Sequence, residues 1–137
     1  MVAIAPEVLA AIVRHARRER PKECCGLLVG RRGRVMWAVA MRNVADSRVR
    51  YRIDDAAHIE VRRVLRGFGP PLAIVGVYHS HPAGDASPSE TDVLEAMYPD
   101  WVQVIVGLKG RTAVRAFRIR NGRVRALRIR KLPRSRR

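Results

Sequence analysis

Apolar residues recur at helical spacing near the start of the chain. Pro6 suits the first turn of a helix, and the pair Arg17-Arg18 suits the negative end of a helix dipole. The pattern predicts an amphipathic helix over residues 6 to about 19, with His15 beside its apolar stripe as a surface or boundary residue. The stripe consists of Leu9, Ile12, Val13 and Ala16.

A second helical pattern lies before the middle of the chain. Asp54 or Asp55 can cap its start, and the glycines and prolines of residues 67–71 end it. His58 faces away from the apolar stripe and is predicted to lie at the surface. The stripe consists of Ala57, Val61, Val64, Leu65 and Phe68.

Most other apolar segments have the length and β-branched composition of strands. A glycine-bounded, Arg-rich turn at residues 30–33 joins two of them in a hairpin, and Asn121-Gly122 is typical of a type I′ turn in another. In that last hairpin, arginine alternates with apolar residues, so we expect one buried and one solvated face. The predicted strands are residues 23–29, 34–41, 50–53, 73–77, 101–108, 112–120 and 124–129.

These elements predict a single α/β domain with a mixed sheet of six to seven strands and about three helices. A length of 137 residues fits one domain. We expect this domain to span residues 1–130, with residues 131–137 as a basic C-terminal tail. No apolar run is long enough for a membrane span, and residues 1–5 are too short for a signal segment, so a cytoplasmic location without membrane association is expected.

The two cysteines, Cys24 and Cys25, are neighbours. A disulfide between adjacent residues is strained, which agrees with a reducing compartment. Because neighbouring strand positions face opposite sides, at most one thiol can reach a pocket. Cys25 shares the face of Glu23, and both cysteines are predicted to be structural.

The chain is strongly basic, with 28 Lys and Arg against 12 Asp and Glu, a formal charge of +16. Such a surface favours acidic partners: nucleic acid, anionic lipid or an acidic protein. The excess is arginine spread along the chain, as a compositional bias would produce, and the few aromatic residues do not interleave with basic ones. Specific nucleic-acid binding is therefore not favoured, an acidic protein partner is a hypothesis, and the oligomeric state is open.

The candidate chemistry is concentrated in residues 78–92. His79 and His81 follow an apolar strand and stand two positions apart, so both imidazoles point to one face. Pro82 cannot continue the sheet ladder and ends the strand, and Gly84 helps to turn the chain. The two imidazoles can therefore converge on one metal ion.

A short helix is predicted after this turn. Ser87 is expected as its N-cap, with Pro88 in the first turn and Glu90 completing a capping box. Asp92 then lies on the same face as Ser89. Two histidines and one carboxylate reach a common pocket, and catalytic zinc sites have this inventory of three protein ligands with an open fourth position.

A zinc hydrolase also needs a general base that is not a ligand. Glu23, which opens an apolar strand after a proline break, has the best position. Glu90 belongs to the predicted capping box, and Glu60 and Glu95 are expected to be solvated. Spacing alone does not settle the choice among these four glutamates.

The chain resembles the JAMM (MPN-type) zinc metalloprotease family, in particular its small prokaryotic single-domain members. The family motif is an early Glu followed by H-x-H-P-x-G-x-x-x-P-S-x-x-D. Glu23 and residues 79–92 match every fixed position. Residues 21–30, and Asn43 followed by residues 51–54, also resemble these members. The resemblance covers residues 6 to 129.

The resemblance implies a three-layer α-β-α sandwich similar to the deaminases, and a role for each motif residue. His79, His81 and Asp92 would bind zinc, with water as the fourth ligand. Glu23 would accept the proton of this water and pass it to the leaving amine. Ser89 would hydrogen-bond the oxyanion of the tetrahedral intermediate.

The implied function is that of a deubiquitinase-like isopeptidase or peptidase. Family members cleave after the Gly-Gly tail of ubiquitin or ubiquitin-like proteins, and small prokaryotic ones are associated with ubiquitin-like modifiers or sulfur-carrier proteins. An alternative is a nucleic-acid-associated protein, since RadC-type proteins share the H-x-H…S-x-x-D core. The segment after Glu23 and the lack of an added helical module argue against it. A non-catalytic interaction module is disfavoured by the complete ligand set.

Overall fold

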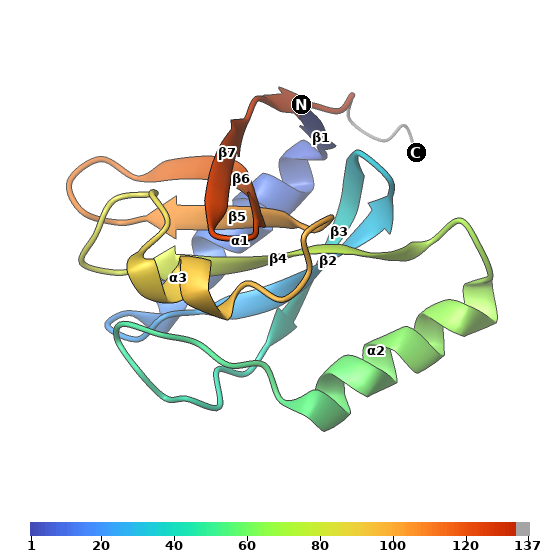
Figure 1. The fold of residues 1–137 in the computed structure, drawn as a ribbon, viewed down its shortest axis with the longest axis horizontal. Coiled ribbons are helices and arrows are strands. Elements are labelled where there is room, and N and C mark those ends of the chain that lie inside the picture. Colours follow the sequence, from blue (N-terminus) through green and yellow to red (C-terminus); the bar gives the residue numbers. More distant parts are fainter. Residues whose placement is uncertain (134–137) are drawn as a thin grey trace.

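The computed structural model describes residues 1–133, which form one mixed sheet with helices on both faces (Figure 1). The α/β class predicted from the sequence is confirmed. The helices are α1 (Pro6–Glu19), α2 (Asp55–Phe68) and α3 (Glu90–Glu95). The strands are β1 (Val2–Ile4), β2 (Cys25–Arg31), β3 (Arg34–Met41), β4 (Ala73–His81), β5 (Val102–Gly107), β6 (Ala113–Arg120), β7 (Arg123–Leu127) and β8 (Ile129–Lys131).

The strand order is β7-β6-β5-β4-β2-β3-β1-β8. Strands β4 and β5 are parallel, as are β1 with β3 and β1 with β8, and the other pairs are antiparallel. The edge strands β7 and β8 are separated in the chain by Arg128 alone. The sheet must therefore curl until its two edges approach each other.

Helix α1 occupies the concave side of this curled sheet. Val8, Ile12 and Ala16, spaced four residues apart, are all buried. They share one apolar cluster with residues of strands β1 to β7. Figure 1 shows α1 behind the sheet and α2 and α3 in front of it, which gives the three layers.

Helix α2 covers the opposite face only thinly. Val61 and Leu65 pack on a small cluster around Leu27 of β2, but none of the residues of α2 is fully buried. Val64 and Phe68, predicted to belong to the buried stripe, are 46% and 72% exposed. This prediction was wrong because the helix touches the sheet along a single line of side chains.

Three local predictions also need correction. His15 is buried, because its Nδ1 atom hydrogen-bonds the hydroxyl of Tyr78 at 2.7 Å on the concave side of the sheet. Residues 50–53 form no strand and contribute only an isolated bridge between Asn43 and Ile53. Strands β1 and β8 were missed, because three residues are too few to show a period.

The predicted basic tail, residues 131–137, lies partly outside the described residues. Lys131 is the last residue of β8, and residues 134–137 are not described. Within residues 1–133, no helix combines the length and the apolar character that crossing a membrane requires.

Candidate active site

The end of strand β4 presents His79 and His81 on the face opposite to α1. Ser80, between them, points the other way. Its hydroxyl accepts a hydrogen bond from the backbone N–H of Cys24 at 2.8 Å, and its own N–H donates to the Cys24 carbonyl at 3.2 Å. These two bonds fix the end of β4 against the residues that precede β2.

Asp92 reaches the same pocket from the first turn of α3. Ser89, not Ser87, is the N-cap: its hydroxyl accepts from the Asp92 N–H at 3.1 Å, and the Asp92 carboxylate accepts from the Ser89 N–H at 2.9 Å. The predicted capping box of Ser87 and Glu90 is wrong. The N–H of Ser87 instead donates to Asp85 in a local turn, so the helix starts two residues later than predicted.

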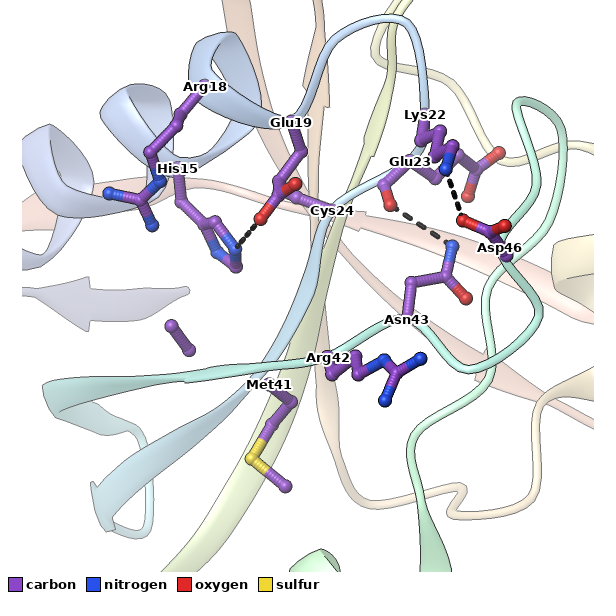
Figure 2. Close-up of a pocket in the computed structure, with 11 residues that line it drawn as sticks. His15, Arg18, Glu19, Lys22, Glu23, Cys24, Met41, Arg42, Asn43 and Asp46 are labelled. Carbon is purple, nitrogen blue, oxygen red and sulfur yellow. Dashed lines mark hydrogen bonds and ion pairs between the residues drawn. The ribbon is translucent and has the colours of Figure 1, made fainter.

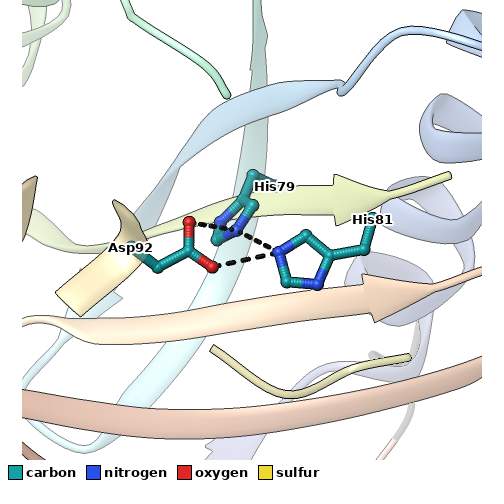
Figure 3. A group of neighbouring side chains, drawn as sticks. All are labelled: His79, His81 and Asp92. Atoms are coloured by element: carbon teal, nitrogen blue, oxygen red, sulfur yellow. Dashed lines mark hydrogen bonds and ion pairs between the residues drawn. The ribbon is translucent and has the colours of Figure 1, made fainter. Parts of the chain in front are cut away.

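The structure brings His79, His81 and Asp92 together (Figure 3). The two Nε2 atoms are 3.2 Å apart, and they lie 3.1 Å and 3.0 Å from the two carboxylate oxygens of Asp92. Two nitrogens bound to one tetrahedral zinc at about 2.0–2.1 Å are themselves about 3.3–3.4 Å apart. The separation found here, and the mixture of imidazole and carboxylate donors, therefore fit a single zinc ion.

Hydrogen bonds and burial prepare these side chains to bind a cation. His81 donates from Nδ1 to the Asp85 carbonyl at 2.8 Å, which leaves its Nε2 lone pair facing the cluster. Burial lowers the pKa of His79 and so favours the neutral imidazole. The pKa of Asp92 is held well below its usual range: burial opposes this, but the close contacts with His79 and His81 prevail.

Glu23 lies beside this cluster. Cys25 and His79 are register partners in the antiparallel pair of β2 and β4, so continuing the register by two residues brings Glu23 level with His81. Glu23 is only 3% exposed, and its Oε1 has no hydrogen-bond partner among the described residues. Burial raises the pKa of Glu23 to about 8, the charge of Asp92 adds to this, and the charge of His81 opposes it.

The other three glutamates considered from the sequence lie differently. Glu60 and Glu95 are 57% and 44% exposed at the side chain and pair with Arg63 and Arg50. Glu90 is the exposed first residue of α3. Among these four carboxylates, only Glu23 is buried.

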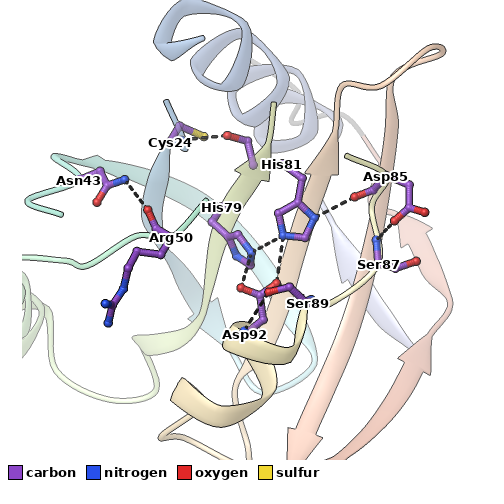
Figure 4. Close-up of polar contacts among 10 residues, drawn as sticks. Cys24, Asn43, Arg50, His79, His81, Asp85, Ser87, Ser89 and Asp92 are labelled. Atoms are coloured by element: carbon purple, nitrogen blue, oxygen red, sulfur yellow. Dashed lines mark hydrogen bonds and ion pairs between the residues drawn. The ribbon is translucent and has the colours of Figure 1, made fainter. Parts of the chain in front are cut away.

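Two residues that the sequence analysis did not assign to the site support it from the loop between β3 and α2. The ring of Tyr51 stacks on that of His79, with centroids 4.5 Å apart and 23° between the planes. The Asn43 amide donates to the carbonyls of Glu23 and Arg50 at 3.1 Å and 3.0 Å, and Figure 4 shows the second contact. The Asn43 side-chain oxygen accepts from the N–H groups of Ala45 and Arg52, both at 3.0 Å.

Asn43 therefore ties the backbone of Glu23 to the residues on either side of Tyr51. The resemblance to small prokaryotic JAMM proteins drew attention to Asn43 and to residues 51–54, but gave them no role. Periodicity cannot find such a residue, because its four partners lie in irregular backbone. Only the folded loop shows that one amide joins the candidate base to the ring stacked on a candidate ligand.

A cavity of about 400 Å³ lies next to Glu23, between the end of α1 and the end of β3 (Figure 2). His15, Lys22 and Asn43 are among its lining residues, whereas His79 and His81 are not. Figure 2 shows the Glu23 carbonyl accepting from Asn43, and Lys22 pairing with Asp46. The cavity is therefore separate from the three-ligand cluster.

The cysteines lie outside the ligand cluster. Cys24 belongs to the apolar cluster under α1, and Cys25 stands opposite His79 in the sheet. Both are buried and free. Burial raises the pKa of Cys24 to about 11 and that of Cys25 to about 12, so both thiols stay protonated at neutral pH. This agrees with the predicted structural role.

Curated proteins with similar sequences are peptidases. The CysO-cysteine peptidase of Mycobacterium tuberculosis is 35% identical over 128 residues, covering 90% of this chain and 86% of that protein. Desampylase of Haloferax volcanii is 33% identical over 117 residues, covering 80% and 83%. A probable TtuB-protein conjugate cleaving protease of Thermus thermophilus is 37% identical over 114 residues, covering 82% and 72%.

Solved structures and a family model agree with these relatives. A solution structure of a Desulfitobacterium hafniense protein, 27% identical, matches with a TM-score of 0.86 over 96% of this chain and 93% of that one. A JAB1/MPN domain protein from Archaeoglobus fulgidus, 15% identical, shares the fold with a TM-score of 0.63 over 97% and 98% of the two chains. The model for prokaryotic homologs of the JAB domain matches residues 5–120. The chain therefore belongs to the prokaryotic branch of the JAB (JAMM/MPN-type) family, as its motif predicted.

Proposed function

We propose that this chain is a zinc-dependent peptidase or isopeptidase that cuts after the C-terminal Gly-Gly of a ubiquitin-like or sulfur-carrier protein. Two relatives are named for cleavage of CysO-cysteine and of a TtuB-protein conjugate, and a third is named desampylase. One observation carries the proposal for this chain. The buried Glu23 carboxylate, with an unpartnered oxygen, stands level with the His79–His81–Asp92 cluster.

His79, His81 and Asp92 would hold the zinc ion. Their donor atoms all lie within 4.8 Å of one another. When bound, zinc supplies the positive charge that acidifies a water molecule and polarises the carbonyl to be attacked. The hydrogen bond from His81 to the Asp85 carbonyl and the stacking of Tyr51 on His79 keep both rings oriented for this task.

Glu23 would take up the proton of the attacking water and deliver it to the leaving amine. A base for this step works best with a pKa near the working pH, and burial already raises the pKa of Glu23 to about 8. A nearby cation favours the ionised carboxylate and lowers that pKa again. Both protonation states of Glu23 are thus accessible near neutral pH.

Ser89 would stabilise the oxyanion. Its oxygen accepts the Asp92 N–H, which fixes the side chain at the start of α3. The hydroxyl hydrogen is left to donate to the negative oxygen that forms during attack. Removing one such donor typically costs about 10²–10³ in kcat.

The surface around the site suits a protein substrate. Val49 in the loop between β3 and α2, and Leu94 in α3, are 76% and 85% exposed, and Met97 just after α3 is 77% exposed. These segments also supply Tyr51 and Asp92 to the site. A contiguous exposed apolar patch beside polar residues is typical of a protein contact surface. We expect the folded part of the modifier to lie there while its glycine tail reaches the zinc.

The test is to incubate the zinc-loaded protein with Gly-Gly-tailed proteins from its own genome, each extended by a residue or conjugated to lysine. Mass spectrometry should show one product ending in Gly-Gly, and chelation should abolish it. Extension by a single cysteine separates a CysO-type activity from an isopeptidase that needs a conjugated lysine. Intact substrates in every case would refute the proposal.

A further inference from the structure

A second candidate site lies at the far end of the sheet from the zinc ligands. It is a broad cleft of about 1430 Å³, lined by Ala73, Ile74 and Val75 at the start of β4. His81 is the last residue of β4, and eight residues of strand span roughly 26 Å. The cleft and the zinc cluster are therefore distinct.

Six arginines line this cleft, and we call it the arginine cleft. Val2, Val35 and Val102, all buried, contribute its apolar part. Asp100 is the only acidic residue among the lining residues, and it pairs with Arg120 at 2.8 Å. The arginines are Arg32, Arg34, Arg118, Arg120, Arg123 and Arg125.

Four of these arginines form a regular array on the β6–β7 hairpin. Arg118 stands directly opposite Arg125, and Arg120 opposite Arg123. Alternation along the strands puts all four on the face that carries Leu127, which belongs to the core under α1. The single buried face predicted for this hairpin is wrong in β7, because Leu127 stands opposite Ala116 on the face of the arginines, whereas Phe117 and Ile119 lie on the other face. The arginines thus face the concave side of the sheet, in the part that the cleft occupies.

The opposed arginines would be stabilised by a bound anion. Like charges directly opposite each other on neighbouring strands destabilise a sheet. Asp100 offsets part of the repulsion between Arg120 and Arg123, because it pairs with Arg120. Among the described residues, Arg118 and Arg125 have no carboxylate within ion-pair distance, so no internal group offsets the repulsion between these two. A ligand carrying several negative charges would offset it.

We propose that the arginine cleft binds the sugar–phosphate backbone of a nucleic-acid strand. Guanidinium groups form bidentate hydrogen bonds with phosphate, and a nucleic acid carries closely spaced charges along its whole length. This matches an array of arginines two residues apart on each strand, in a chain of net charge +16. An acidic polypeptide reaches this charge density only where every residue is acidic, whereas every nucleotide carries a phosphate. Trp101 is the only aromatic lining residue, so binding follows the backbone and not the base sequence.

The experiment measures the affinity of a fluorescein-labelled oligothymidylate over a range of salt concentrations. At about 0.7 per neutralised phosphate, six arginines give a slope of log affinity against log salt of about −4. The variant Arg118→Gln/Arg125→Gln should weaken the slope by about 1.4. The control Arg48→Gln/Arg111→Gln removes the same charge from exposed positions outside the cleft and should change the slope much less.

Two further measurements complete the test. Since Arg118 and Arg125 repel each other, their double variant should keep the wild-type melting temperature or exceed it, which separates lost binding from lost folding. Poly-glutamate should compete poorly with the oligonucleotide at equal charge. Equal losses in both arginine pairs would show that net charge alone attracts the strand, and strong competition by poly-glutamate would assign the cleft to an acidic polypeptide. Either result overturns the proposal. The zinc cluster takes no part in the readout, so failure here leaves the peptidase proposal standing.

Discussion

The backbone N–H of Ser89 donates to the carboxylate of Asp92 at 2.9 Å, and this carboxylate also meets Nε2 of both histidines. One side chain thus stabilises the start of α3 and completes the candidate zinc cluster. Forming the helix and placing the third ligand are the same event. A helix of six residues is too short to be stable alone, so this cap matters for its position.

Replacement of Asp92 should separate the two roles. Asp92→Asn keeps an oxygen that can accept the Ser89 N–H but removes the negative charge, so we expect zinc affinity to fall about 100-fold or more, since even partners of metal ligands matter by 10–100-fold. Asp92→Ala also removes the cap and should cost about 1 kcal/mol more in unfolding free energy without metal. Titration calorimetry with zinc and urea unfolding in chelator measure the two effects. Zinc binding by Asp92→Asn at wild-type affinity would exclude Asp92 as a ligand.

Ser89 and Ser87 form a matched pair for testing the cap and the oxyanion donor. Ser89→Ala should lower the unfolding free energy by about 1 kcal/mol and kcat by about 10²–10³. Ser87→Ala should change neither much, because its hydroxyl only contacts Arg115 at 3.4 Å on the surface. Unfolding curves and steady-state rates check both variants. An equal loss in Ser87→Ala would restore the cap that the sequence predicted.

Asn43 should stabilise the loop between β3 and α2. Asn43→Ala removes four hydrogen bonds, and at about 0.5–1.5 kcal/mol each this predicts a loss of about 2–6 kcal/mol in unfolding free energy.

Tyr51→Leu removes the ring stacked on His79 and should weaken zinc binding about 10-fold, whereas Tyr51→Phe keeps the ring and should bind normally. Urea unfolding and zinc titration measure the effects. Equal zinc affinities in both Tyr51 variants would show that stacking does not orient His79.

The sequence predicted the parts of the site whose spacing is local. His79 and His81 share a face because strands alternate, and Asp92 follows at a fixed offset. The exact start of α3 could not be predicted, because Ser87 and Ser89 both precede acidic residues, and the turn at Asp85 decides between them. Contacts between segments far apart in the sequence could not be predicted from local spacing either.

The buried position of His15 illustrates that second limit. A histidine beside the apolar stripe of a helix can be either buried or exposed to solvent. The hydrogen-bond partner that decides this for His15 is Tyr78, which is 63 residues away in the chain. The arginines of the last hairpin illustrate it too. Their alternation was visible, but the sequence does not show which face of the sheet α1 covers or that Leu127 pairs with Ala116 on the arginine face.

The raised pKa of Glu23 predicts a pH dependence of stability in the metal-free protein. Burial raises this pKa from 4.5 to about 8, so between these values the folded state holds a proton that the unfolded chain has released. The contribution of Glu23 to the unfolding free energy is therefore fully present below about pH 4.5. It is lost as the pH rises to about 8, by up to about 1.4 kcal/mol per pH unit. Glu23→Gln cannot titrate and lacks this contribution.

Urea unfolding in chelator, from pH 5 to pH 8, measures this effect. The variant minus wild-type difference in unfolding free energy should increase with pH, and taking the difference cancels the shared titration of the histidines. A constant difference would mean that Glu23 titrates normally and is not held in an apolar pocket.

The central claim is that Glu23 moves protons beside a zinc ion held by other residues. Its most direct test combines zinc stoichiometry and cleavage rate in the Glu23→Gln variant, with a Gly-Gly-linked substrate in single-turnover conditions. The account predicts one zinc per chain in both proteins and a rate at least about 10²-fold lower in the variant. Cleavage by Glu23→Gln at the wild-type rate with zinc fully bound would contradict it.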